Sequence, residues 1–242
     1  MDTNVLAMLP IQLPTFAANS KLKPMNIKDE IRKACKDMKE DNIQESFKNI
    51  AETLLKNFCL QCGDKKYYFA EIEFYYYDKE KFNKVWNERT YPRDDRKAGD
   101  LFFHYSGFDI CFDSSFKDGK FGGILIRSLI DVTKTDNKFV TGPLLCVNEV
   151  LNACSKAKKW LEIEELTDEE KQSQNRDCVI SEPVSRYGIS YNDAGETQDV
   201  LWCFFDQRML DENNQKNKYA KSSWNFVKKE AKDITRYYHR FD

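Results

Sequence analysis

The sequence lacks the short motifs that identify several large enzyme classes. It contains no phosphate-binding P-loop, no GxGxxG turn, no GxSxG nucleophile elbow and no HExxH zinc motif. Its one Gly-Gly pair, Gly122-Gly123, precedes an apolar run, where a tight turn explains it. The sequence therefore argues against a P-loop nucleotide hydrolase, a Rossmann-type dehydrogenase, an α/β-hydrolase and a zincin protease.

Long apolar runs are also missing. No apolar stretch approaches the ~18–20 residues that a membrane span needs, so we expect no membrane partner. Residues 1–16 lack the basic region and the continuous apolar core of a signal peptide. We therefore expect a cytoplasmic protein, or a nuclear one if the organism is a eukaryote.

Histidine is rare, and the one cysteine pair at metal-binding spacing is Cys59-Leu-Gln-Cys62. A tetrahedral zinc site needs further ligands, and the sequence offers no second pair and only two histidines. We interpret Cys59 and Cys62 as cysteines at the end of a helix, and we expect neither a metal nor another cofactor. Most other cysteines lie in apolar or helical patterns, which is typical of reduced, buried thiols.

The composition is that of a soluble globular protein. Of the 242 residues, 41% are hydrophobic, 14% aromatic and 32% charged, which allows a sizeable core with many aromatic side chains. The net charge of −2 gives no overall attraction to nucleic acid. Any contact with DNA must therefore depend on a local basic patch.

The periodicity of apolar residues divides the chain into three parts. Residues 1–60 are predicted to form an irregular arm followed by two helices, over about 27–40 and 43–57. Residues 61–210 are predicted to form a core of strands at 66–77, 101–105, 108–113, 123–132, 178–190 and 200–206, with helices near 79–86 and 143–157. Residues 211–242 contain a last helix, over 218–240. Strands and helices do not alternate regularly, so we predict a single-domain α+β fold.

Two carboxylates are set into an unusually aromatic strand, residues 67–77, with the sequence YYFAEIEFYYY. Side chains alternate along a strand, so Glu71, Glu73 and Tyr75 share one face while Ile72 and Phe74 share the other. The apolar face suits a core. The polar face is either exposed to water, or it lines a cleft in which rings stack on a planar ligand and a carboxylate acts as acid or base.

A basic patch of the required kind occurs near the end of the sequence. Residues 216–240 contain eight lysines and arginines, among them Lys228, Lys229 and Lys232, against only two acidic residues. Such a run is usually the solvated face of a helix. Contact with the DNA backbone is the alternative interpretation.

Several short matches follow one another in order along the core. They are Glu71-Ile-Glu73-Phe-Tyr75, Tyr91-Pro-Arg93-Asp94, Gly99-Asp-Leu101-Phe-Phe-His104, Gly107-Phe-Asp-Ile-Cys-Phe-Asp113, Gly123-Ile-Leu-Ile-Arg127, Thr141-Gly-Pro143, Ser185-Arg-Tyr-Gly-Ile189 and Leu201-Trp-Cys-Phe-Phe205. Over roughly residues 66–206, this order and spacing resemble the alkyladenine (3-methyladenine) DNA glycosylase family. The resemblance implies a single domain with a curved, mostly antiparallel sheet, flanked here by N- and C-terminal helices.

The resemblance also implies a role for individual residues. Glu73 falls on the glutamate that activates water for attack on the sugar of a flipped-out nucleotide, and Arg127 on an arginine that holds this glutamate. Tyr75 and His104 fall on positions that stack against the extruded base. Arg93 falls on a motif arginine near the same cleft, where it would contact DNA.

The chain departs from the family pattern at three places. The histidine that follows the first motif in the family has no counterpart in residues 78–90. Asp113 replaces an asparagine that discriminates among purines, so it either accepts a hydrogen bond from a base or pairs with a nearby arginine. The wedge tyrosine that fills the gap left by the flipped base falls near Tyr105-Ser106.

The resemblance implies a monofunctional, metal-free DNA glycosylase that excises alkylated or deaminated purines. Its partner would be double-stranded DNA with a damaged purine, and we expect a monomer. Two alternatives remain from the sequence: a relative that binds DNA or a nucleotide without cleaving it, and an N-glycoside hydrolase that acts on free nucleosides or nucleotides.

Overall fold

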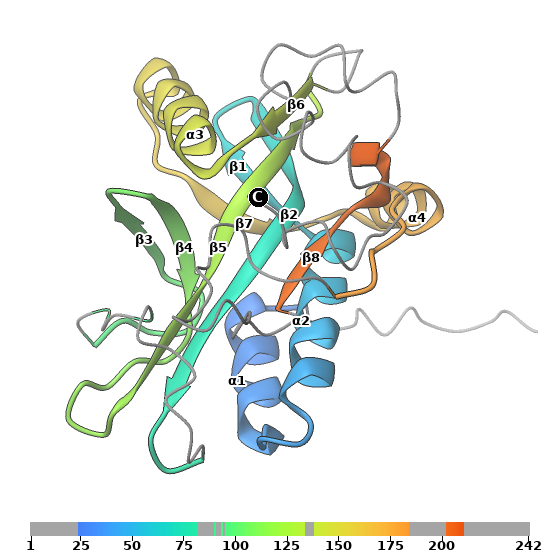
Figure 1. The fold of residues 1–242 in the computed structure, drawn as a ribbon. Helices are drawn as coiled ribbons and strands as arrows, with labels where there is room; N and C mark the ends of the chain where they lie inside the picture. The colour runs from blue at the N-terminus through green and yellow to red at the C-terminus, as the bar shows by residue number, and fades with distance from the viewer. Residues whose placement is uncertain are drawn as a thin grey trace, which may run out of the picture.

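The structure, a computed structural model, describes residues 24–81, 90, 93, 95–133, 138–183 and 202–210. These residues form an α+β fold in which helices surround a curled antiparallel sheet of eight strands, shaped like half of a barrel (Figure 1). The predicted α+β class is therefore confirmed. The finer prediction, an arrangement of the alkyladenine glycosylase type, stays a prediction.

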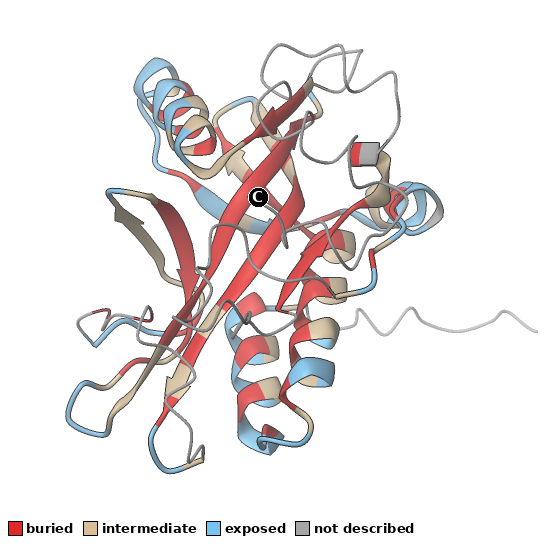
Figure 2. Ribbon diagram, viewed as in Figure 1, coloured by how far each residue is buried: buried red, intermediate tan, exposed pale blue. Residues whose placement is uncertain are grey.

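The sheet is built around one long antiparallel pair, β2 (Lys65–Asp78) and β5 (Lys120–Asp131). The strand order is β3-β4-β5-β2-β1-β7, and β6 and β8 pair with β5 and β2, respectively. The shorter strands are β1 (Phe58–Cys62), β3 (Leu101–His104), β4 (Gly107–Cys111), β6 (Lys138–Thr141), β7 (Glu162–Glu165) and β8 (Cys203–Phe205). Figure 2 shows that most of the β2–β5 pair is buried.

The register of the central pair shifts twice near its middle. Phe69 pairs with Leu129, Glu71 with Ser128 and Ile72 with Ile126, so each strand contains one extra residue in this part of the register. These two residues are Ala70 on β2 and Arg127 on β5. Bulges of this kind change the direction of nearby side chains. Here the bulges lie where the charged side chains of Glu71 and Arg127 are buried in the sheet.

Two helices cover the apolar face of β2. They are α1 (Ile27–Asp37), whose N-cap Asn26 accepts a hydrogen bond from Lys28 N, and α2 (Ile43–Asn57). The Phe47 ring of α2 stacks on Phe74 at 4.4 Å and meets Trp202 edge-on at 4.9 Å. The core is thus aromatic, as the composition predicted, and one apolar cluster contains residues of both the predicted extension and the predicted core.

Helix α3 (Pro143–Ala157) packs against β4, β5 and β6 on the opposite side from α1 and α2 (Figure 1). Its side chains reach the polar side of the sheet, where Cys146 Sγ lies 3.4 Å from Arg127 O and Glu149 contacts Tyr67 Oη. Helix α4 (Asp168–Asp177) begins with a capping box between Thr167 and Glu170. No helix in the described part of the chain is long and apolar enough to cross a membrane.

The structure confirms helices at 43–57 and 143–157 and strands that correspond to 66–77, 101–105, 108–113, 123–132 and 200–206. Helix α1 ends three residues before the predicted limit.

Several predictions of secondary structure were wrong or incomplete. Cys59 and Cys62 were predicted at a helix end but lie in β1. Five elements were not predicted: β1, β6, β7, α4 and the 3₁₀ helix η1 (Gln207–Leu210). In the predicted strand 178–190, residues 178–183 form only an isolated bridge, Ile180 to Asp206. Three other predicted elements lie wholly or mostly outside the described residues: the irregular arm 1–25, the helix 79–86 and the helix 218–240.

Candidate functional site

Charged and polar side chains are buried on the face of the sheet that carries Glu73. Glu71 and Glu73 are 0% exposed, and the nearby Arg93, Asp109 and Arg127 are at most 5% exposed. Burying a charge is costly unless it is paired, so a group of five such residues in the middle of a sheet is unusual. This buried network, which also includes Ser128 and His104, is the candidate functional site.

Arg127 connects the two glutamates of β2. Its Nε atom donates to Glu71 Oε1 at 3.2 Å, and its Nη1 atom lies 3.3 Å from Glu73 Oε1. Tyr75 Oη donates to Glu73 Oε2 at 2.9 Å, and Ser128 Oγ donates to Glu71 Oε2 at 2.7 Å. Arg127 is the extra β5 residue between the partners of Glu71 and Ile72. A bulge redirects nearby side chains, and here the guanidinium of Arg127 reaches both acids.

A second group of buried charges lies on β4, which is separated from β2 by β5. Asp109 Oδ2 accepts from Arg93 Nε at 2.8 Å and lies 2.6 Å from Arg93 Nη2, while Asp109 Oδ1 lies 3.3 Å from His104 Nε2. Asp109 and Glu73 both pair with Leu125 of β5. Residues opposite one another in antiparallel strands point to the same face, so the two acids flank Leu125 on one side of the sheet.

Gly123 makes room for the Arg93–Asp109 pair. It was interpreted as part of a tight turn, but it lies within β5, between Tyr75 on β2 and Cys111 on β4 and two residues before Leu125. A Cβ atom at this position would lie 2.7 Å from Arg93 Nε and 2.8 Å from Asp109 Oδ2. The arginine head group thus lies over the backbone of β5, in a space that any side chain would fill.

Replacing Gly123 with alanine is therefore expected to displace the Arg93–Asp109 pair without disturbing the rest of the strand. The backbone angles of Gly123 lie outside the left-handed region, so alanine at this position introduces no backbone strain. We expect a lower midpoint of urea denaturation together with a loss of any activity that depends on the network, because the added methyl group separates two buried charges. Gly122→Ala is not a suitable control, since its Cβ would lie 2.4 Å from Tyr75 O. An unchanged midpoint and activity in Gly123→Ala would contradict this account of the network.

The cysteines beside the network are poor nucleophiles. Burial is the main reason, and the negative charge of Asp109 the second, that the pKa of Cys111 is raised to about 12. Burial also raises the pKa of the Cys146 thiol, which lies next to Arg127. Both groups stay protonated near neutral pH, and a thiol without its charge is a weak nucleophile. The carboxylates are therefore the stronger candidates for a base at this site.

The hairpin formed by β3 and β4 presents an aromatic side chain to solvent. Tyr105, in the turn between the two strands, is 90% exposed, and it directly follows His104. His104 Nδ1 lies 2.9 Å from Ser106 Oγ, so the turn and the buried network share this histidine. An exposed tyrosine of this kind is available to contact a partner, whereas a core position would bury it.

The structure places five of the ten predicted site residues in this group of buried charges. Glu73 is in direct contact with both Tyr75 and Arg127, and His104 lies 3.3 Å from Asp109 in the second group of buried charges. Arg93 was predicted to contact DNA, but it is 2% exposed and paired with Asp109, so its place is inside the network. Lys228, Lys229 and Lys232 lie outside the described residues.

Asp113 lies beside the N-terminal helix α1. Its carboxylate accepts from Arg32 Nε at 2.9 Å and from Ala98 N at 2.9 Å. The hydrogen bond from Arg32 is the main reason that its pKa lies below the usual value. Of the two interpretations of Asp113, the structure supports the acid paired with an arginine.

Three members of the network were not assigned a role from the sequence: Glu71, Asp109 and Ser128. Glu71 shares a face with Glu73, so strand alternation already placed it there. Asp109 was recognisable as the one acid within the apolar strand Gly107–Cys111. Ser128 gave no signal of its own.

Comparisons of the chain with protein-family models, with curated proteins and with solved structures gave no match. The resemblance to the alkyladenine DNA glycosylases therefore stays a prediction from the sequence.

Proposed function

We propose that this protein is a DNA base-excision glycosylase that removes alkylated or deaminated purines by hydrolysis of the N-glycosidic bond. The observation that carries the proposal is the contact of Glu73 with Arg127 and Tyr75 at the centre of the sheet. Glu73 and Tyr75 come from one motif of the resemblance and Arg127 from another, and their association was a requirement of the proposed chemistry. Their contact supports the proposal, because unrelated residues of a strand pair need not meet.

In this proposal Glu73 acts as the general base. It takes a proton from a water molecule whose oxygen attacks C1′ of the flipped nucleotide, and the bond between C1′ and the purine nitrogen breaks with its electron pair on the base. Arg127 and Tyr75 hold the carboxylate in one orientation. The negative charge of Glu73 also offsets the positive charge that develops on the sugar.

The β3–β4 hairpin would supply the contact that extrudes the base. Tyr105 projects from its turn into solvent, and an aromatic side chain inserted into the base stack can take the place of the flipped nucleotide. Since His104 precedes Tyr105 and reaches Asp109, insertion of the turn would place DNA next to the buried network. His104 then has the ring face required for stacking on an extruded base.

A second candidate function is DNA or nucleotide binding without cleavage. The observation that favours it is the complete burial of Glu73, whose two carboxylate oxygens are both occupied, one by Arg127 and the other by Tyr75. A base must be within reach of the proton that it takes, directly or through one water molecule. A carboxylate held in this way serves equally as a structural partner of Arg127.

The two functions are separated by incubating the protein with duplex oligonucleotides that carry a single hypoxanthine, ethenoadenine or 3-methyladenine. A glycosylase leaves abasic sites, which alkali converts into strand breaks at the position of the lesion. Retention of the lesion duplex in a gel-shift assay without strand breaks would favour binding without cleavage. If neither binding nor strand breaks were observed with any of these lesions, both functions would be excluded for this set of substrates.

A further inference from the structure

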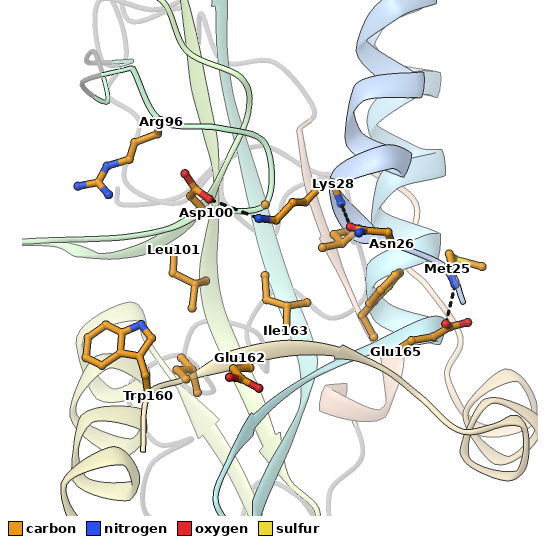
Figure 3. Close-up of a pocket in the computed structure, with 14 residues that line it drawn as sticks. Met25, Asn26, Lys28, Arg96, Asp100, Leu101, Trp160, Glu162, Ile163 and Glu165 are labelled. Carbon is orange, nitrogen blue, oxygen red and sulfur yellow. Dashed lines mark hydrogen bonds and ion pairs between the residues drawn. The ribbon is translucent and has the colours of Figure 1, made fainter. Parts of the chain in front are cut away.

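A groove separates the two edges of the curled sheet (Figure 3). It has a volume of about 670 Å³ and lies between the segment that leads into β3 on one side and β7 on the other. Leu101 and Ile163 lie across from each other in its centre, and the start of α1 closes one end, where Met25 N donates to Glu165 Oε2 at 2.6 Å. The groove is separate from the buried network around Glu73, since no residue lines both.

The backbone of β7 has hydrogen-bonding groups that point into this groove. Leu166 N donates to Asn57 O at 2.8 Å, and the antiparallel register continues with Glu164 opposite Cys59 and Glu162 opposite Gln61. Bonded and non-bonded residues alternate in an antiparallel pair, so the N–H and C=O groups of Ile163 and Glu165 point away from β1. Within the described residues, β7 pairs with β1 alone. Its outer edge is therefore a template for another strand.

The side chains of β7 have opposite character on the two faces. Ile163 is half-buried and points toward Leu101, on the groove side (Figure 3). Glu162 and Glu164 are exposed and alternate with Ile163, and Glu162 also forms part of the groove wall. Both belong to an acidic stretch that continues into the first turn of α4. A strand added to β7 would place alternate side chains against an apolar surface and against two carboxylates.

An exposed tryptophan lies at the other end of the groove. Trp160 is 63% exposed, and its ring centre lies 5.8 Å from that of Phe103 on β3. It precedes β7 by two residues and lines the groove beyond the start of the strand (Figure 3). An exposed indole offers a flat apolar surface and binds cationic groups over its face.

We propose that the outer edge of β7 binds an extended peptide of a partner protein in which lysine or arginine residues alternate with apolar ones. The peptide backbone bonds to Ile163 and Glu165, its apolar side chains enter the groove beside Ile163 and Leu101, and its cationic side chains face Glu162 and Glu164. Main-chain bonds provide affinity in this mode of recognition, and the alternating side chains provide specificity. This inference does not depend on the proposed enzymatic function.

The same charges argue against a second copy of this chain as the occupant. Two β7 strands paired edge to edge would bring Glu162 and Glu164 of one copy opposite the acids of the other, and like charges directly opposite one another are destabilising. Acidic residues on an edge strand are a common protection against self-association. A basic peptide reverses this effect, because each of its cations then meets a carboxylate.

The proposal is tested by fluorescence anisotropy with the full chain and a labelled eight-residue peptide of alternating lysine and valine. Three matched peptides serve as controls: one with glutamate in place of lysine, one with the same composition in scrambled order, and one with N-methyl groups on alternate residues. We expect saturable binding of the lysine–valine peptide and much weaker binding of all three controls, because each lacks the charge, the alternation or the backbone donors. No saturable binding up to millimolar peptide, or equal binding of the N-methylated peptide, would overturn the proposal.

Two variants locate the binding on β7. Glu162→Lys combined with Glu164→Lys is expected to weaken binding of the lysine–valine peptide by about 10-fold or more and to strengthen binding of the glutamate–valine peptide. Ile163→Pro removes an outward N–H group and leaves the bonds to β1 in place, so it should abolish binding while the far-ultraviolet circular dichroism stays unchanged. If the charge-reversed variant binds both peptides as the natural chain does, the site is not β7 and the proposal is wrong.

Discussion

Replacing Glu73 with glutamine is expected to lower the rate of base excision by at least ~100-fold, the usual effect of losing a general base, while DNA binding is retained. Glutamine has the same size as glutamate, and its carbonyl oxygen can still accept the hydrogen bond from Tyr75. Arg127 keeps a carboxylate partner in Glu71, so the variant should fold. Single-turnover excision from a lesion duplex measures the chemical step, and a gel-shift assay measures binding.

Glu71→Gln is the matched control for this variant. Glu71 lies on the same strand, is equally buried and binds the same arginine, but its other oxygen accepts from Ser128. If Glu73 is the base, excision should fall much further in Glu73→Gln than in Glu71→Gln. Equal losses would mean that the two acids matter only as partners of Arg127. Unchanged excision in Glu73→Gln would remove this residue from its assigned role.

Elements with a strong apolar period were predicted correctly from the sequence, and those without one were missed. The apolar stripe that begins at Ile43 and includes Phe47, Ile50 and Leu54 predicted α2 with the bounds that the structure shows. Helix α4 has no such stripe, since its sequence DEEKQSQNRD is polar throughout. It is held by the capping box of Thr167 and by Gln174 Nε2, which donates to Leu55 O at 2.7 Å. The Thr-x-x-Glu pattern of the box was the only local sign of this helix.

The short strands β1 and β7 could not be predicted because their formation depends on the elements next to them in the chain and in the sheet. Strand β1 follows α2 without a break, so its apolar residues continue the helical pattern. In β7 the only apolar residue is Ile163, between exposed glutamates. An edge strand is stabilised by the strand beside it, and its own sequence carries little of that information.

The sequence predicted which residues share the site better than it predicted their contacts. Alternation placed Glu71, Glu73 and Tyr75 on one face, and the motif order added Arg127. The bulge that aims Arg127 at both glutamates is a property of the strand pairing and leaves no local sign in the sequence. The place of Arg93 over Gly123 likewise depends on a long-range approach, which only the folded chain reveals.

Replacing Arg127 with methionine is expected to lower the free energy of unfolding by about 3–5 kcal/mol, because it removes the cation from two buried carboxylates. Methionine preserves most of the length and apolar volume of the arginine stem, so the loss of charge dominates. Glu71 and Glu73 are 0% exposed, and water cannot replace the guanidinium without opening the sheet. Urea denaturation at neutral pH, followed by tryptophan fluorescence, measures the change if the transition is two-state.

Arg32→Met is the matched control, since Arg32 also pairs with a carboxylate through its Nε atom, at 2.9 Å from Asp113. That pair is exposed to solvent, where water screens the charges, so the midpoint of denaturation should hardly move. Adding Glu71→Gln to Arg127→Met removes one of the two unpaired charges and should restore part of the lost stability. If Arg127→Met unfolds no more easily than Arg32→Met, the buried network does not hold the centre of the sheet together, and the orientation assigned to Glu73 loses its support.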